Sequence, residues 1–362
     1  MKILELPHCL SDYLCPVNGL CDIYQWKTGK RLPEELIFYS HTGFQLISQN
    51  KSNPPKMIFL GNTSIGERQF NFWKDIIGYN IFSNEDKTFV STLSEIKELI
   101  DKNIPVIIFG LDMFHLEYQT KFYHKTHIPG HVVLMVGYDH KGIYIHDNSK
   151  QGIQSIFLDD LLLAWQNDYI GISKKNAYFG IDMKEPNVNV GNIIKRGLHK
   201  TANLFLNPPV SFMGSKGLER FLTEFSTWHT VYSDKILKSI YFHFITFTGS
   251  TLPEPPSEFN NNASEINNPH QAARDALADA LLKYIDNFGE PSWKLYAQAF
   301  KKSGEIIEQV VHGFTQDILS NTFNNSLKYA ELFRQIRDIE TQAYKNFLCS
   351  SQDLNLNQRN KI

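Results

Sequence analysis

Residues 130–139 read Gly-His-Val-Val-Leu-Met-Val-Gly-Tyr-Asp, and Asp147 follows sixteen residues after His131. The apolar run 132–136 and the short β-prone run 142–146 are separated by a cluster of turn-forming residues. This pattern predicts a β-hairpin in which His131 opens the first strand and Asp147 ends the second. We therefore expect the imidazole and the carboxylate to meet at one end of a sheet. There the carboxylate can hold the ring in the tautomer that a general base needs.

A cysteine at the start of a predicted helix is the candidate nucleophile for this pair. Cys15 and Pro16 open the segment 15–29, in which several apolar residues share one helical face and Gly29 suits the position after the last turn. Proline suits the first helical position, which places Cys15 at or beside the N-cap. A helix N-terminus carries partial positive charge and free N–H groups, which favour a thiolate and can bind an oxyanion. The sequence therefore predicts that Cys15 is a nucleophile activated by His131.

These motifs resemble the papain-like fold of the bacteriocin-processing cysteine peptidases and, more closely, the N-terminal domain of the butirosin biosynthesis protein H family. The resemblance covers roughly residues 1 to 183. Besides the Cys15 helix, the features that carry it are Leu32-Pro-Glu-Glu-Leu-Ile-Phe38 followed by Gly43-Phe44, Ile104-Pro105-Val106-Ile-Ile with Asp112 and Tyr118 after it, and the segment with His131 and Asp147. The remainder resembles, more weakly, the helical domain that often follows, through Phe212-Met-Gly214-Ser-Lys-Gly217-Leu218 with Trp228 and through Thr248-Gly249.

The resemblance implies an α+β fold: a papain-like, cysteine-protease-type domain with an antiparallel sheet, followed by a mainly α-helical domain. It implies a Cys-His-Asp acyltransferase of natural product biosynthesis, with Cys15, His131 and Asp147 catalytic and with Asp112 and Tyr118 on the substrate side. Such an enzyme takes an acyl group from an acyl carrier protein thioester, where the group is carried on phosphopantetheine, and passes it to a small-molecule amine. No bound cofactor is expected.

Two other cysteines are alternatives for the nucleophile. Members of the family often place a histidine directly before the catalytic cysteine, and here His8 and Cys9 form that dipeptide. The helical phase and the distance to Gly29 favour Cys15 over Cys9, while Cys21 would lie inside the helix. Papain-like enzymes carry an oxyanion-hole glutamine six residues before the cysteine, a position that Cys9 occupies here. The sequence therefore does not identify the side-chain oxyanion donor.

Two other functions remain open alongside acyl transfer. A papain-like peptidase or amidohydrolase would use the same triad, with water or a peptide in place of the amine. A non-catalytic binding module would keep the fold without using the thiol. In that case a Cys15→Ala variant would keep its function.

The chain changes character near its middle. Short strands alternate with helical segments up to about residue 182, a pattern that indicates an α+β domain. After residues 184–190 helical periodicity dominates, most clearly over 272–284 and 292–333, and strand signals nearly vanish. We therefore expect a catalytic domain over residues 1–185 and a mainly helical substrate- or partner-recognition domain over residues 190–362.

Composition excludes several classes of protein. The 36 Lys and Arg residues balance 38 Asp and Glu residues, so no global field favours nucleic acid or an anionic membrane. The N-terminus lacks the apolar segment of a signal peptide, and no apolar run reaches the roughly 18–20 residues of a membrane span, so a cytoplasmic protein is expected. Three of the four cysteines lie six residues apart, without paired zinc-ligand spacing, and no metal site is expected. His124 and His127 lack a third clustered ligand in the sequence and are interpreted as part of a solvated loop.

Overall fold

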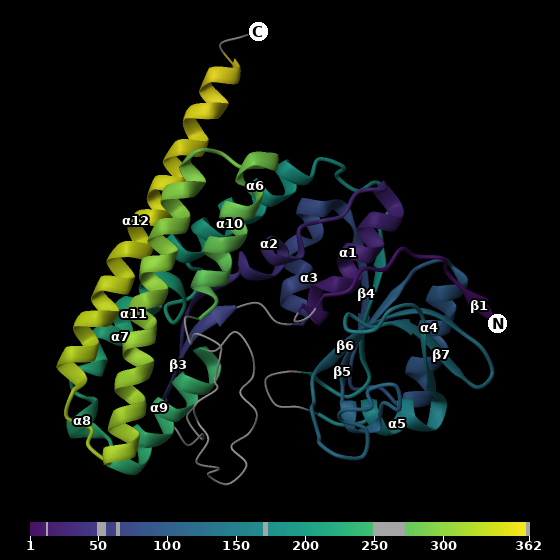
Figure 1. The fold of residues 1–362 in the computed structure, drawn as a ribbon, viewed down its shortest axis with the longest axis horizontal. Helices are drawn as coiled ribbons and strands as arrows, with labels where there is room; N and C mark the ends of the chain where they lie inside the picture. Colours follow the sequence, from purple (N-terminus) through teal and green to yellow (C-terminus); the bar gives the residue numbers. More distant parts are fainter. Residues whose placement is uncertain (12–13, 49–55, 63–65, 169–172, 249–271, 360–362) are drawn as a thin grey trace. The chain divides into compact units, whose positions relative to one another are not determined.

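A computed structural model describes residues 1–11, 14–48, 56–62, 66–168, 173–248 and 272–359 of the 362-residue chain (Figure 1). The contacts between its residues divide the chain into two compact units, and neither unit is one continuous stretch of sequence. Unit 1 consists of residues 1–38 and 64–193, and unit 2 consists of residues 39–63 and 194–362.

Unit 1 is built on a 7-stranded sheet. Its strands are β1 (Lys2–Ile3), β4 (Asn80–Asn84), β5 (Val106–Leu111), β6 (His131–Tyr138), β7 (Gly142–His146), β8 (Gln154–Phe157) and β9 (Ala177–Asp182). The main order is β4-β9-β5-β6-β7-β8, every pairing is antiparallel, and β1 pairs with β6. The α+β class and the antiparallel sheet expected from the sequence are thus confirmed, and β6 and β7 form the predicted hairpin.

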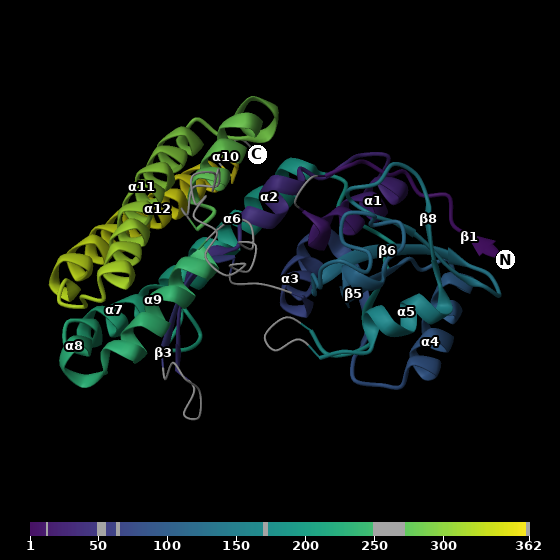
Figure 2. The same cartoon turned by 60° about the horizontal axis from the view of Figure 1, so that its bottom comes forward.

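Helices cover both faces of the central strands. The helices of unit 1 are α1 (Cys15–Thr28), α2 (Glu34–Tyr39), α3 (Glu67–Trp73) continuing into a π-helical turn η1 (Lys74–Gly78), α4 (Phe89–Asp101), the 3-10 turn η2 (Met113–His115) and α5 (Leu158–Trp165). In Figure 2, α1 lies above strands β5 and β6, and α4 and α5 lie below them. Residues on both sides of β5 are accordingly buried, which explains why this strand reads as a continuous apolar run.

Helix α1 begins and ends where the sequence predicts. Cys15 is its first residue and Pro16 its second, and the helix ends at Gly29, whose φ of 71° is the left-handed conformation that glycine adopts most easily. Gly19 allows α1 to approach the sheet closely, because a Cβ there would lie 3.1 Å from the Cβ of Leu134. This close packing fixes the N-terminal turn of α1 against strand β6.

Unit 2 is mainly helical. It contains α6 (Val190–Leu206), α7 (Gly214–Phe225), α8 (Trp228–Val231), α9 (Asp234–Thr248), α10 (Arg274–Phe288), α11 (Ser292–Ser320) and α12 (Ser326–Arg359). The helical C-terminal half is confirmed, but the periodic stretch 292–333 is two helices, not one. Asn321 ends α11 with a left-handed φ of 51°, which turns the chain back so that α12 packs beside α11.

A β-hairpin from the first fifth of the chain belongs to unit 2. Strands β2 (Thr42–Ser48) and β3 (Lys56–Asn62) pair with each other and pack against helices α7 and α9. Their buried side chains, Phe44, Leu46, Ile58 and Leu60, share one hydrophobic core with residues of α7, α9, α11 and α12. The helical unit therefore requires residues that precede His131 in the sequence.

Among the described residues, no helix combines the length and apolar character that crossing a bilayer would require.

Candidate active site

His131 and Asp147 meet at the end of the β6–β7 hairpin, as the sequence predicts. Gly130, with a φ of 87°, turns the chain into β6, and Asp147 directly follows the last residue of β7. The Nε2 atom of His131 lies 2.5 Å from Oδ2 of Asp147, and both side chains are almost fully buried. The carboxylate therefore fixes the orientation of the ring and leaves Nδ1 for another partner.

Four further hydrogen bonds hold the Asp147 carboxylate. Tyr118 Oη and Gln119 Nε2 donate to Oδ2 at 2.9 and 3.0 Å, and the backbone N–H and hydroxyl of Ser149 donate to Oδ1 at 2.8 and 2.7 Å. Burial opposes ionisation of this carboxyl, but the hydrogen bonds and charge of His131, together with Ser149, hold the pKa of Asp147 well below its usual range. Asp147 is therefore a buried carboxylate with a full set of donors. Gln119 and Ser149 were not identified by sequence reasoning; the Asp-Asn-Ser turn signal at 147–149 is the one local hint of Ser149.

The charge on Asp147 controls the protonation of His131. Burial lowers the pKa of this imidazole, but the hydrogen bond that His131 donates to Asp147, the negative charge of Asp147 and the neighbouring Cys15 raise the pKa of His131 to about 10. The ring is accordingly an imidazolium near neutral pH.

Cys15 completes the cluster from the opposite element. It is half-buried at the first residue of α1, and it is one of the groups that raise the pKa of His131. The structure thus brings together Cys15, His131 and Asp147, the three residues that the sequence predicts to act together, with His131 between the other two.

The alternative cysteines lie in different surroundings. Cys9 Sγ is 4.0 Å from the Oε1 atom of Gln25. Cys21 is fully buried inside α1, and this burial raises the pKa of the Cys21 thiol well above its ordinary value. A buried neutral thiol is a poor nucleophile.

The two residues expected on the substrate side lie on the segment between β5 and β6. Tyr118 donates a hydrogen bond to the Asp147 carboxylate, as described above. The Asp112 carboxylate accepts hydrogen bonds from the backbone N–H groups of Phe114 and Ile128, each at 3.1 Å, and lies 2.6 Å from Nδ1 of His127. Asp112 therefore ties the start of this segment to its end, three residues before His131.

Two known families match parts of the chain. Residues 14–148, from the residue before Cys15 to the residue after Asp147, match the family described as butirosin biosynthesis protein H, N-terminal. Residues 160–249 match a family described as a domain of unknown function (DUF4872). A search of curated proteins found no match to the chain.

Proposed function

We propose that this chain, whose residues 14–148 match the family described as butirosin biosynthesis protein H, N-terminal, is a cysteine-dependent acyltransferase of natural product biosynthesis. In this proposal an acyl group passes from a carrier-protein thioester to Cys15 and then to an amine. The observation that carries the proposal is the placement of His131 between the ionised Asp147 and the Cys15 thiol.

In the first half-reaction, the Cys15 thiolate attacks the carbonyl carbon of the donor thioester and forms a tetrahedral intermediate. The backbone N–H groups at the start of α1 are the donors that this proposal assigns to its oxyanion. The bond between carbonyl carbon and pantetheine sulfur then breaks. The leaving thiolate takes the proton of the His131 imidazolium, which leaves an acyl-enzyme and a neutral imidazole.

In the second half-reaction, the amine nitrogen attacks the acyl-enzyme and a carbon–nitrogen bond forms. Neutral His131 accepts the proton that the amine loses, and the bond between carbonyl carbon and Cys15 sulfur breaks. The products are the amide and the thiolate–imidazolium pair, so the site returns to its starting charge. Asp147 stabilises the imidazolium before the first half-reaction and after the second, and does not itself transfer a proton.

We assign recognition of the carrier protein or the amine to the helical C-terminal unit. That half contains one cysteine, Cys349, which is exposed on α12 and has no role in the proposed chemistry. A transferase must bind two substrates and keep water from the acyl-enzyme, a requirement that a second unit can meet.

The test measures how much amide and how much free acid the full-length protein forms. Acetyl-pantetheine should add one acetyl group to wild type, located on Cys15 by peptide mapping, and none to Cys15→Ser. Addition of a primary amine such as 1,4-diaminobutane should then release mainly amide. Cys9→Ser serves as the matched control and should behave as wild type. Release of free acid alone, at a rate independent of the amine concentration, would identify a hydrolase, and the absence of any acyl-enzyme would indicate a binding module.

A further inference from the structure

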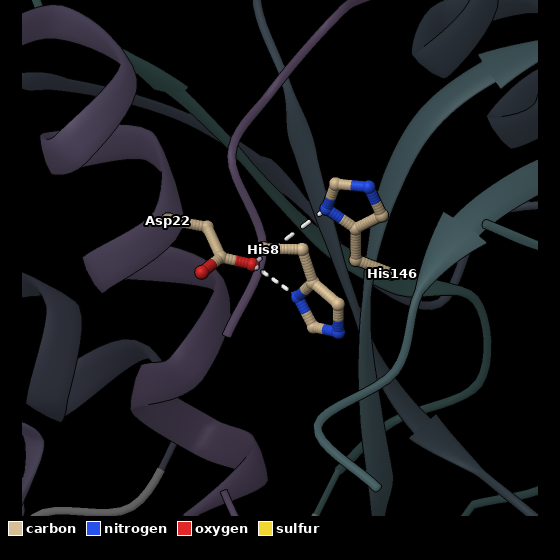
Figure 3. Close-up of side chains that lie close together, drawn as sticks. All are labelled: His8, Asp22 and His146. Atoms are coloured by element: carbon tan, nitrogen blue, oxygen red, sulfur yellow. Dashed lines mark hydrogen bonds and ion pairs between the residues drawn. The ribbon is translucent and has the colours of Figure 1, made fainter. Parts of the chain in front are cut away.

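A second group of titratable side chains lies beside the proposed triad. His8 comes from the N-terminal segment, Asp22 from the second turn of α1 after Cys15, and His146 from the end of β7 (Figure 3). Figure 3 shows one nitrogen of each imidazole directed at the same carboxylate oxygen. His8 Nδ1 is 2.7 Å and His146 Nδ1 is 3.6 Å from Asp22 Oδ2, and all three side chains are almost fully buried.

The hydrogen bonds of His8 determine which of its nitrogens is available. Its Nε2 atom lies 3.0 Å from the carbonyl oxygen of Asp147 and 3.1 Å from that of Lys150. A carbonyl oxygen can only accept, so Nε2 carries a hydrogen and Nδ1 is the atom directed at Asp22. Histidines that bind metals usually donate their other ring N–H to a backbone carbonyl or carboxylate in this way.

His146 has a buried polar atom without a hydrogen bond. Its Nδ1 atom finds no hydrogen-bond partner among the described residues, and 3.6 Å is too far for a hydrogen bond to Asp22. A buried polar atom of this kind costs about 1–3 kcal/mol unless something binds it. The direction of the atom, toward Asp22 Oδ2, indicates where such a partner would lie.

The charges around Asp22 favour a cation between Asp22 Oδ2 and His146 Nδ1. Arg31 donates to the other oxygen, Asp22 Oδ1, at 2.7 Å and also pairs with Glu34. Arginine stays charged in proteins. If both imidazoles are neutral, the carboxylates of Asp22 and Glu34 carry two negative charges against the one positive charge of Arg31, so one negative charge is in excess. A proton on His8 or a divalent ion between the three side chains can balance it. The ion would also give His146 Nδ1 a partner.

We propose that His8 Nδ1, Asp22 Oδ2 and His146 Nδ1 bind a divalent transition metal, with Zn²⁺ the best match. Two imidazoles and one carboxylate form a ligand set that zinc accepts, with a fourth position left for water. The three atoms lie within 4.8 Å of one another. In a tetrahedral zinc site, two ligand atoms lie roughly 3.3 Å apart. This separation falls between the distances of 2.7 and 3.6 Å from Asp22 Oδ2 to the Nδ1 atoms of His8 and His146. Small side-chain movements would therefore complete the site.

The ion would link the segments that carry the proposed catalytic residues. Asp22 shares α1 with Cys15, His146 precedes Asp147, and His8 bonds the Asp147 carbonyl. The metal would therefore hold α1 and the end of β7 together without touching the acyl group. Cysteine spacing could not reveal this site, because its ligands are two histidines and an aspartate that lie 14 and 124 residues apart along the chain.

The test uses the full-length protein after removal of metals with a chelator. Isothermal titration should show one Zn²⁺ bound per chain with a rise in Tm. Co²⁺ should give the visible spectrum of nitrogen and oxygen ligands, without a sulfur-to-cobalt charge-transfer band. His8→Gln and His146→Gln should each weaken Zn²⁺ binding at least about 100-fold, since loss of even an indirect partner of a metal site costs 10- to 100-fold.

His127→Gln is the matched control, because His127 also pairs with a carboxylate, belongs to the cluster Asp112, His115 and His127, and is largely exposed. It should bind Zn²⁺ as wild type does. The proposal is overturned if wild type binds neither ion tighter than about 100 µM, if Co²⁺ shows thiolate ligation, or if His127→Gln alone abolishes binding. In the first case, nitrogen NMR of a doubly protonated His8 ring would identify a proton as the balancing cation.

Discussion

A buried pair of opposite charges can be compared in each unit of the molecule, and the two pairs differ in whether the cation can lose its proton. In unit 1, His131 pairs with Asp147. In unit 2, Arg274 donates through Nε and Nη2 to the two oxygens of Glu340 at 2.8 and 3.1 Å, and both side chains are at most 1% exposed. Ser303 donates a third hydrogen bond to Glu340, at 2.6 Å.

Further hydrogen bonds tie the arginine pair to its surroundings. Arg274 Nη1 and Nη2 donate to the carbonyl oxygens of Ala272 and Gly43, which ties α10 and α12 to the β2–β3 hairpin. Because arginine cannot be deprotonated in a protein, this pair can only support the fold. The histidine pair instead leaves one ring nitrogen toward Cys15, and imidazole can gain and lose a proton. The comparison separates a pair that contributes stability from a pair suited to chemistry, and each can be tested alone.

The largest effect is expected from His131→Gln. Without the imidazole, neither thiolate formation nor proton transfer to the leaving group is assisted, so acyl-enzyme formation should fall at least about 10⁴-fold. Stopped-flow measurement with acetyl-pantetheine checks this, with circular dichroism to confirm folding. A folded variant that acylates within tenfold of wild type would remove His131 from the chemistry.

Asp147→Asn should leave a weaker but measurable enzyme. The amide can accept from Tyr118 and Gln119 but provides no charge to stabilise the imidazolium, so acylation should slow by about 10²- to 10⁴-fold. The same acylation assay applies. Unchanged acylation would mean that Asp147 is only a turn residue.

Arg274→Met should affect stability and leave the triad intact. It leaves Glu340 buried without its partner, and loss of one member of a buried pair typically costs about 3–5 kcal/mol. Urea denaturation measures the change. The matched control is Arg334→Met, whose partner Glu331 is exposed, with an expected change below about 1 kcal/mol. A fall in acylation rate of the folded Arg274→Met protein, rather than in its stability, would contradict the separation of the two pairs.

The smallest effect is a dependence of stability on pH. The pKa of His131 is raised to about 10 in the folded protein from an ordinary 6.5, so its contribution is complete below about pH 6.5 and declines as pH rises toward 10. The pKa of Asp147 is lowered, so its contribution is present above about pH 4 and is lost at lower pH. The stability difference between wild type and His131→Gln should therefore shrink between pH 6.5 and 9.5. A difference that is constant over this range would contradict the imidazolium assignment.

The parts of the fold that the sequence predicted are those with a local signal. Cys15 followed by proline, with Gly29 at the end of the helix, marks α1, and the two apolar runs mark the β6–β7 hairpin that carries His131 and Asp147. Both signals are complete within about fifteen residues.

The parts that were missed depend on distant residues. Strand β2 is stabilised by helices α7 and α9, which lie well over a hundred residues later, and its own sequence shows no clear alternation. Gln119 reaches Asp147 as a single polar residue of an irregular segment, a position that no periodicity marks. The meeting of His8, Asp22 and His146 follows from the packing of α1 on the sheet and has no motif of its own.

We propose Cys15 as the nucleophile of a site made by α1 and the β6–β7 hairpin. The most direct measurement is the rate at which iodoacetamide modifies each cysteine of the native protein near neutral pH, read by peptide mass spectrometry. We expect Cys15 to be modified first, and its rate to fall to that of an ordinary thiol in His131→Gln while the rates of Cys9 and Cys349 stay unchanged. Preferential modification of Cys9 with Cys15 inert, or a Cys15 rate that does not depend on His131, would contradict the claim.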